Sequence, residues 1–303
     1  MFKTFSACVV PISSGHGMQD SYRSSPDEGR ARSLVKFKNE STPSPVEYRL
    51  VQLIPRTQSF RHPLSIKLYS VSKIIGPKRF QRTIAQDVTW TIEPRSQYVI
   101  LSNRPESLAV FLNVIAGLSI PTEGWVKRKG KISPPGGFLR YSTGGTPLDL
   151  IRLLAPLYQF DAEQVLDFVA ATVRYDRLLR TPLEQLPLPL RHELNFILTY
   201  AIPCDYYFFG MPRGGRPEFR KLGQQILARR SKEATMLLGT SSEHIARSVG
   251  PNARAAILHR GNFTLYERLD DALAVFAQLE PETAIPNEAL EGEPSEDDVD
   301  LII

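Results

Sequence analysis

The chain has 303 residues, of which 42 % are hydrophobic and 23 % charged, a composition that fits a globular protein and excludes a wholly disordered or fibrous one. Its two cysteines, Cys8 and Cys204, form neither a disulfide framework nor a metal-binding spacing, so we expect a reducing compartment. The net charge of +5 combines two ends of opposite sign. Residues 1–82 carry fourteen Lys/Arg and five Asp/Glu, whereas residues 280–303 carry nine acidic residues and no basic one.

Composition divides the chain into three segments. Residues 1–63, rich in Ser, Pro, Gly and charge, are predicted to form a flexible basic extension, and residues 281–303 an acidic disordered tail. Residues 64–280 alternate short β-rich runs with longer amphipathic ones and are predicted to form one domain. The longest uncharged apolar run, residues 108–120, is too short to span a bilayer, and we expect neither a membrane span nor a signal peptide.

Taken in chain order, the runs of this domain predict strands that alternate with helices, which is typical of an α/β fold with a largely parallel sheet. The apolar run around residues 205–211 is predicted to be a central strand, because it is apolar on both faces. Gly261 and Asn262 are predicted to form a turn between two strands. The predicted strands are 65–71, 87–93, 97–102, 205–211, 234–240, 254–260 and 262–268, and the predicted helices are 106–117, 148–157, 162–173, 191–200, 218–230, a short one near Ser242, and 270–279.

Several short motifs follow one another along residues 65–280. They are VSK at 71–73, DVTWTIEP at 87–94, IAGL at 115–118 followed by Pro121 and Gly124, GGF and TG between residues 136 and 144, PLDLIRLLAPLY at 147–158, and CDYYFF at 204–209. In order and spacing the chain resembles the ATP-binding subunits of ABC transporters, especially those of capsular-polysaccharide and O-antigen exporters. The resemblance implies a P-loop NTPase fold with a mainly parallel core sheet, an antiparallel β subdomain near residues 65–95 and a helical insertion near residues 145–200.

The resemblance also locates the phosphate-binding loop of this family, G-x-x-x-x-G-K-[ST], on residues 102–109. Leu108 stands at the lysine that neutralises the phosphates, and Ala109 at the hydroxyl residue that binds Mg²⁺. Pro105 lacks a backbone N–H, and Glu106 adds an anion that costs about 4 kcal/mol if it lies ~4 Å from a phosphate charge at a dielectric of ~20. We therefore expect no nucleotide binding at this vestigial loop, whose residues include Ser102, Arg104, Glu106, Ser107, Leu108 and Ala109.

Other catalytic positions of the family are replaced as well. The adenine-stacking aromatic residue falls at Ile75, the glutamine that reaches the metal at Leu139, the signature at Leu188-Pro189, the Mg²⁺ aspartate and catalytic glutamate at Gly210 and Met211, and the switch histidine at Ser241. The resemblance therefore implies that the chain keeps the fold of the family without its catalytic residues. We expect no enzyme activity, no cofactor and no metal. Because both halves of the composite ATP site are altered, an intact partner subunit would not complete it.

The function that this resemblance implies is a catalytically inactive, structural or regulatory component of capsule or O-antigen polysaccharide export across the inner membrane of a bacterium. Its expected partners are the membrane subunit of the exporter or an active ATPase paralogue, in a homo- or heterodimer. We expect a cytoplasmic location, peripheral to the inner face of that membrane, and no nucleic-acid partner. The family position that meets the membrane subunit falls on Arg140, Tyr141 and Ser142.

Two alternatives remain open. The chain can be a functional nucleotide-binding subunit that binds ATP and Mg²⁺ with Arg104 or another base in place of the lysine. It can also be a free-standing cytoplasmic adaptor that binds through its basic extension and acidic tail. The remaining candidates have structural interpretations: Ser242 as a helix N-cap, Cys204 as a buried strand-end residue, and the basic run Lys127, Arg128, Lys129 and Lys131 as a solvated sheet edge, with lipid headgroups or nucleic acid as its less favoured ligands.

Overall fold

The computed structural model describes residues 53–55, 64–141, 144–173, 176–209, 217–250 and 252–279. Three predicted site residues, Ser142, Gly210 and Met211, lie outside the described residues, as do Cys8, the acidic tail, and the basic extension apart from residues 53–55.

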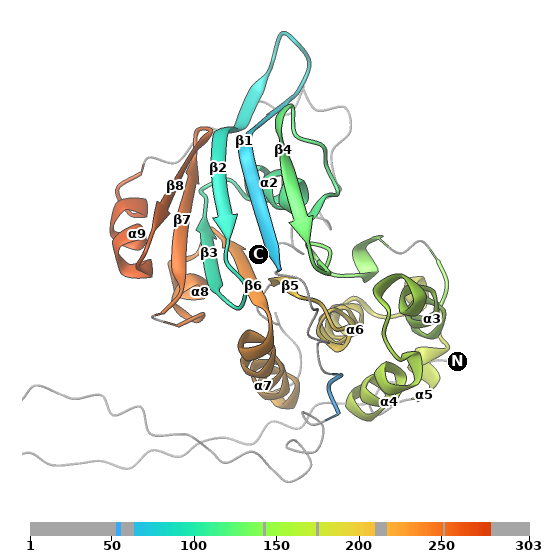
Figure 1. The fold of residues 1–303 in the computed structure, drawn as a ribbon. Helices are drawn as coiled ribbons and strands as arrows, with labels where there is room; N and C mark the ends of the chain where they lie inside the picture. The colour runs from blue at the N-terminus through green and yellow to red at the C-terminus, as the bar shows by residue number, and fades with distance from the viewer. Residues whose placement is uncertain are drawn as a thin grey trace, which may run out of the picture. The chain divides into compact units, whose positions relative to one another are not determined.

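An antiparallel sheet begins the domain. It contains β1 (Ser65–Ile75), β2 (Arg82–Ile92) and β4 (Glu123–Lys129) in the order β2-β1-β4 (Figure 1). Side chains alternate along β1, so that Ile66 and Leu68 are buried while Lys67 and Tyr69 lie on the opposite face. The buried face packs over α2 (Pro105–Ala116) and the second sheet. The expected antiparallel subdomain is therefore present, and β4 joins it from a later part of the chain.

The second sheet has five strands in the order β5-β6-β3-β7-β8. Its strands β5 (Tyr206–Phe209), β6 (Thr235–Thr240), β3 (Gln97–Leu101) and β7 (Arg254–His259) are parallel, and β8 (Asn262–Tyr266) pairs antiparallel with β7. This mainly parallel sheet, together with the antiparallel one, confirms the predicted α/β fold class.

Two details of this sheet differ from the prediction. Strand β5 ends the strand order rather than lying at its centre. Its outer edge is nevertheless covered, because Asp205 and Tyr206 donate their N–H groups to Lys131 O (2.8 and 3.1 Å). The strand is apolar on both faces because Tyr207 packs in one hydrophobic cluster and Tyr206 and Phe208 pack in the other. The turn between β7 and β8 is formed by Arg260 and Gly261, both at positive φ (48° and 83°), one residue earlier than predicted.

The helices complete the domain. Figure 1 shows α3 (Pro147–Tyr158), α4 (Ala162–Val173), α5 (Asp176–Leu179) and α6 (Leu188–Ala201) grouped together, as the predicted helical insertion requires. Helix α6 begins three residues earlier than predicted, because Pro189 is tolerated in a first turn. The other helical segments are α7 (Pro217–Glu233), α8 (Glu243–Arg247), α9 (Leu269–Phe276) and the short 3-10 turns Leu139–Tyr141 and Leu183–Gln185. None of the described helices has both the length and the apolar character that crossing a bilayer requires.

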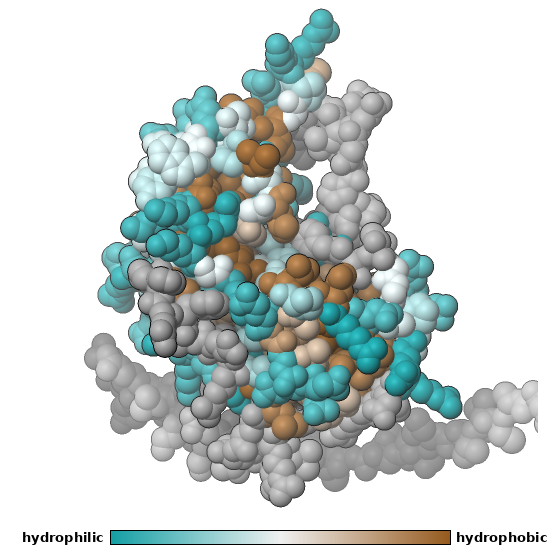
Figure 2. All heavy atoms as spheres, turned by 45° about the vertical axis from the view of Figure 1, so that its right-hand side comes forward, coloured by the Kyte–Doolittle hydropathy of each residue, from teal (hydrophilic) through white to brown (hydrophobic). Residues whose placement is uncertain are grey.

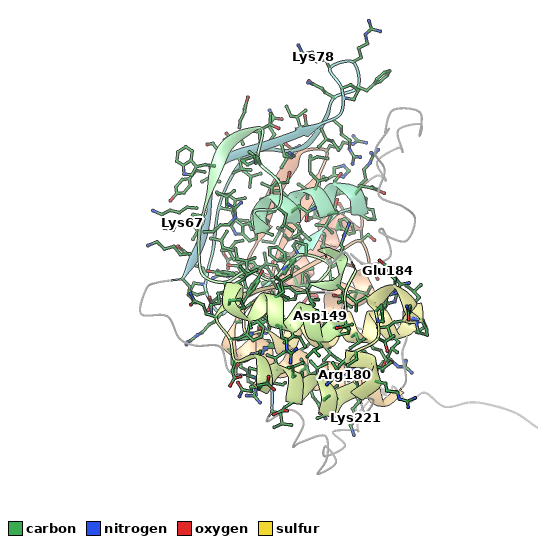
Figure 3. All side chains as sticks on the ribbon, turned by 90° about the vertical axis from the view of Figure 1, so that its right-hand side faces the viewer. Lys67, Lys78, Asp149, Arg180, Glu184 and Lys221 are labelled. Atoms are coloured by element: carbon green, nitrogen blue, oxygen red, sulfur yellow. The ribbon has the colours of Figure 1, made fainter. Side chains whose placement is uncertain are left out.

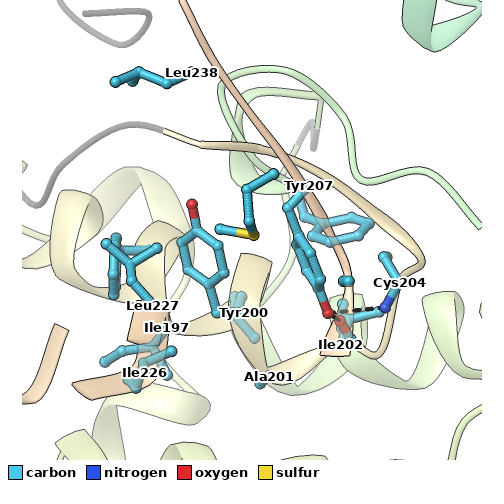
Figure 4. Close-up of a cluster of buried hydrophobic side chains, with 14 of the residues drawn as sticks. Ile197, Tyr200, Ala201, Ile202, Cys204, Tyr207, Ile226, Leu227 and Leu238 are labelled. Atoms are coloured by element: carbon cyan, nitrogen blue, oxygen red, sulfur yellow. Dashed lines mark hydrogen bonds between the residues drawn. The ribbon is translucent and has the colours of Figure 1, made fainter. Parts of the chain in front are cut away.

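A buried aromatic cluster lies where α6, α7 and β5 meet (Figure 4). The hydroxyl of Tyr207 donates to Ile202 O (2.8 Å) and accepts from the N–H of Cys204 (2.8 Å). Cys204 is 1 % exposed, which confirms its predicted buried position before β5, and burial raises the pKa of its thiol. This position is structural, since a thiol with a raised pKa is a poor nucleophile.

Arg230, on α7, is fully buried beside this cluster. Its guanidinium donates to Tyr200 O (2.8 Å) and Ala201 O (3.2 Å), the final carbonyls of α6, and to Pro55 O (2.7 Å). Ile54 is 1 % exposed within the same core. Ile54 and Pro55, which the sequence analysis includes in the extension, therefore pack against the helices of the domain.

Arg128 also differs from the rest of the basic run. Its Nε donates to Ile115 O (2.7 Å) and a terminal nitrogen donates to Val114 O, so the side chain caps the C-terminal carbonyls of α2. Partial burial lowers the pKa of its guanidinium. The solvated-edge interpretation thus fails for Arg128, whereas Lys127 and Lys129 are exposed.

We expect Arg128→Ala to lower the free energy of unfolding by about 1.5–3 kcal/mol, because two carbonyls of α2 lose a charged donor. The neighbouring change Lys127→Ala removes an exposed charge and is expected to alter stability by no more than about 0.5 kcal/mol. Urea unfolding of the two variants checks this, and equal losses would show that Arg128 is not a cap.

Candidate functional site

The loop between β3 and α2 occupies the position of the predicted phosphate-binding loop. Strand β3 ends at Leu101 and α2 begins at Pro105, so only three residues connect them. Proline suits the first turn of a helix because its φ is already helical and its missing N–H has no partner to lose there. Glu106 and Ser107 consequently lie in the first helical turn, where the phosphate-binding motif has loop residues.

The backbone donors of this loop are directed toward the chain itself. The N–H of Ser102 donates to Thr240 O (3.2 Å), at the end of β6, and the N–H of Arg104 donates to Ser102 Oγ (3.3 Å). Pro105 has no N–H to offer. Since a phosphate cradle consists of free amides that converge on an anion, these hydrogen bonds remove two of its donors and proline removes a third.

Leu108, at the position of the family lysine, is a core residue. It is 1 % exposed and packs on Gly239 of β6. The contact is close: a Cβ on Gly239 would lie 2.8 Å from Leu108 Cδ2 and 2.9 Å from Leu112 Cδ1. A lysine in this side-chain position would place its ammonium among apolar groups, where no phosphate can reach it.

Arg82 is a residue of this site that the sequence analysis did not identify. From the start of β2 it donates to the hydroxyl of Ser107 in the first turn of α2. Ile75, at the end of β1, pairs with Arg82 across the hairpin and is partly buried against the core. The structure therefore brings Ile75, Arg82 and Ser107 together. Sequence spacing gives no indication of the contact between Arg82 and Ser107, because the two residues are 25 positions apart and Arg82 lies outside every motif.

Solved structures with this arrangement are ABC cassettes. A dimeric bacterial ABC transporter cassette matches with a TM-score of 0.52 and 16 % identity over 65 % of this chain and 95 % of its own. An ATP-binding subunit of an ABC transporter matches with a TM-score of 0.56 and 17 % identity over 70 % of this chain and 93 % of its own. The chain has the fold of an ABC ATPase cassette.

Sequence similarity to curated proteins is low but spans nearly their whole length. The capsule polysaccharide export ATP-binding protein CtrD of Neisseria meningitidis is 24 % identical over 216 residues, which are 71 % of this chain and 99 % of CtrD. The ATP-binding protein BexA of Haemophilus influenzae is 21 % identical over 71 % of this chain and 99 % of BexA. The polysialic acid transport ATP-binding protein KpsT of Escherichia coli is 21 % identical over 69 % of this chain and 94 % of KpsT. No protein-family model matches the chain.

The other predicted positions in this cassette differ in their surroundings. The N–H of Leu139 donates to Asn195 Oδ1 (3.1 Å), and its side chain packs on the helical core. Arg140 is half-buried, with its Cδ 2.9 Å from the place that a Cβ on Gly136 would occupy. Leu188 opens α6 and is 49 % exposed, and the helix has no side-chain N-cap. Ser241 precedes Ser242, which caps α8 by accepting from the N–H of Ile245 (3.4 Å), as predicted.

Around the loop of this cassette, the residues present do not fit Mg-ATP. Leu108 cannot neutralise phosphate, Ala109 cannot bind a metal, and Glu106 is exposed in the first turn of α2. Its carboxylate is better explained by the positive N-terminal end of the helix, which it stabilises. Within the described ranges, no group of three His, Cys, Asp or Glu residues is arranged to hold a metal ion.

Proposed function

We propose that this cassette is a non-catalytic homologue of ABC ATP-binding subunits and acts as a structural or regulatory component of a polysaccharide exporter. The observation that carries the proposal is the burial of Leu108 against Gly239, at the position where ATP binding requires a lysine. The hydrogen-bonded loop and the early start of α2 at Pro105 support it, because they leave few donors for phosphate.

The export role is supported by the sequence relatives. Two of the three that we describe carry a polysaccharide in their names, namely a capsule polysaccharide and polysialic acid, a polymer of carboxylate-bearing sugars. The proposed partner is a membrane subunit of such an exporter or an active ATPase paralogue, at the inner face of the inner membrane. Arg140, Tyr141 and Ser142 are the proposed contacts with the membrane subunit.

An apolar surface on the helical insertion supports action through protein contacts. Leu153 and Leu157, one turn apart on α3, are 63 % and 69 % exposed. Figure 2 shows hydrophobic patches among hydrophilic residues on the side of the molecule that includes this insertion. Neighbouring exposed leucines of this kind favour a protein partner.

We expect the full chain to bind no ATP in calorimetry at concentrations up to about millimolar, with or without Mg²⁺, which corresponds to less than about 4 kcal/mol of binding free energy. Glu106→Ala, which removes the anion nearest the expected phosphates, is expected to leave this result unchanged, because the cation and the free amides are still missing. A cassette with an intact phosphate-binding loop serves as the positive control. Binding by the wild-type chain at about tens of micromolar would overturn the proposal.

The second candidate is a working nucleotide-binding subunit with a replacement cation, and the contact of Arg82 with Ser107 favours it. This contact places a guanidinium at the first turn of α2, beside the loop that Arg104 ends. The same calorimetry separates the candidates: if the wild-type chain binds ATP and Arg82→Met does not, Arg82 replaces the lysine and this second function is adopted.

A further inference from the structure

The outer face of the antiparallel sheet gathers basic and aromatic side chains from two strands. We call it the basic aromatic face and define it by Lys67 and Tyr69 of β1 and Trp125, Lys127 and Lys129 of β4. Lys67 lies opposite Lys127 and Tyr69 opposite Trp125 in the strand register. Figure 3 shows Lys67 pointing away from the body of the domain, as the burial of its neighbours Ile66 and Leu68 requires.

The aromatic pair forms a flat platform on this face. The rings of Tyr69 and Trp125 stack with centroids 5.0 Å apart and an interplanar angle of 20°. Trp125 is 62 % exposed, whereas the other tryptophan, Trp90, is 4 % exposed in the core. Tyr69 covers one side of the indole, which leaves the remaining surface open to a planar or ring-shaped ligand.

The lysines of this face repel one another. Directly opposed like charges weaken a strand pair, yet Lys67 faces Lys127, and Lys129 follows two residues later on the same side of β4. None of the three forms an ion pair with another residue that the structure describes. Arg128, between Lys127 and Lys129, turns to the opposite face to cap α2. An anionic ligand would relieve this repulsion.

We propose that the basic aromatic face binds an anionic polysaccharide, with a sugar ring against Trp125 and its carboxylates at the lysines. The weakly positive C–H groups of a sugar ring suit the negative face of an aromatic ring. Lysines on alternate strand residues are about 7 Å apart, so one extended polymer reaches several of them. The inference rests on the proposed function, because the ligand class is that of an exported polymer, but it does not require ATP to bind or to be absent.

Single-stranded nucleic acid is less well matched. Platforms for nucleic acid stack successive bases on separate aromatic residues, whereas here the two rings stack on each other. The exposed cations of the face are lysines, and arginine is the residue preferred for nucleic-acid phosphates. The test therefore includes single-stranded DNA, and tighter binding of the DNA would identify nucleic acid as the ligand.

The test titrates the full chain with polysialic acid oligomers, with neutral dextran of similar length and with single-stranded DNA of similar charge. Saturable binding of polysialic acid is expected, weakened by added salt and absent with dextran. Trp125→Ala and the double variant Lys67→Gln/Lys127→Gln are each expected to weaken it by about tenfold or more. The matched control is Lys78→Gln, an exposed lysine at the far tip of the β1–β2 hairpin in Figure 3, which should change the affinity by less than about twofold.

No saturable binding of polysialic acid would overturn the inference, as would equal binding by the Trp125 variant or tighter binding of the DNA. Circular dichroism melts of each variant establish that it is folded. Failure of this inference is distinguishable from failure of the proposed function: ATP binding in calorimetry contradicts the latter and leaves the titration with polysaccharide unaffected.

Discussion

Replacing Leu108 by lysine, which restores the family residue of the phosphate-binding loop, is expected to lower the free energy of unfolding by about 3–5 kcal/mol. It is not expected to restore ATP binding. The side chain of residue 108 lies against Gly239 and Leu112 in the core, so the new ammonium would be desolvated without a partner. Urea unfolding measures the loss, and calorimetry with Mg-ATP tests for the gain.

The matched control is Leu108→Met, which keeps an apolar side chain of similar volume and should cost less than about 1.5 kcal/mol. If Leu108→Lys retained wild-type stability and bound Mg-ATP, the side chain at this position would be able to face the loop. The site would then be repairable, and the proposal of a non-catalytic cassette would lose its main support.

Arg230→Met is the second change with a large expected effect, a loss of about 3–5 kcal/mol in the free energy of unfolding. Arg230 is fully buried and serves carbonyls from two parts of the chain: Tyr200 and Ala201 at the end of α6, and Pro55 in the preceding segment. Methionine fills a similar volume but leaves these carbonyls buried without a donor. Its neighbour Glu233 would also lose an ion pair of 3.2 Å.

Arg229→Met provides the comparison, since Arg229 is partly exposed where it donates to Ile54 O (3.1 Å) and pairs with Glu233. We expect it to cost about 0.5–1.5 kcal/mol. Denaturant unfolding followed by tryptophan fluorescence gives both values. If the two variants lost the same free energy of unfolding, burial of the guanidinium at residue 230 would make no extra contribution to stability.

Much of the candidate site could be predicted from the sequence, because its chemistry depends on residue types. A proline, a leucine and an alanine cannot supply an amide, a cation or a hydroxyl, wherever the fold places them. What could not be predicted is how the loop is closed. Thr240 accepts from Ser102, and Arg82 reaches Ser107, through contacts between strands and helices that are distant in the sequence.

The sequence by itself determined the alternation of strands and helices, since apolar periodicity along residues 65–279 depends only on local geometry. It also determined the buried position of Cys204. The tertiary structure decided the order of the strands, which places β5 at an edge, and the opposite roles of Arg128 and Lys127 on one strand. It decided as well that Leu108 packs on Gly239 and that Pro55 O accepts a hydrogen bond from Arg230. Pairing and packing join residues far apart in the chain, and no local pattern encodes which of them meet.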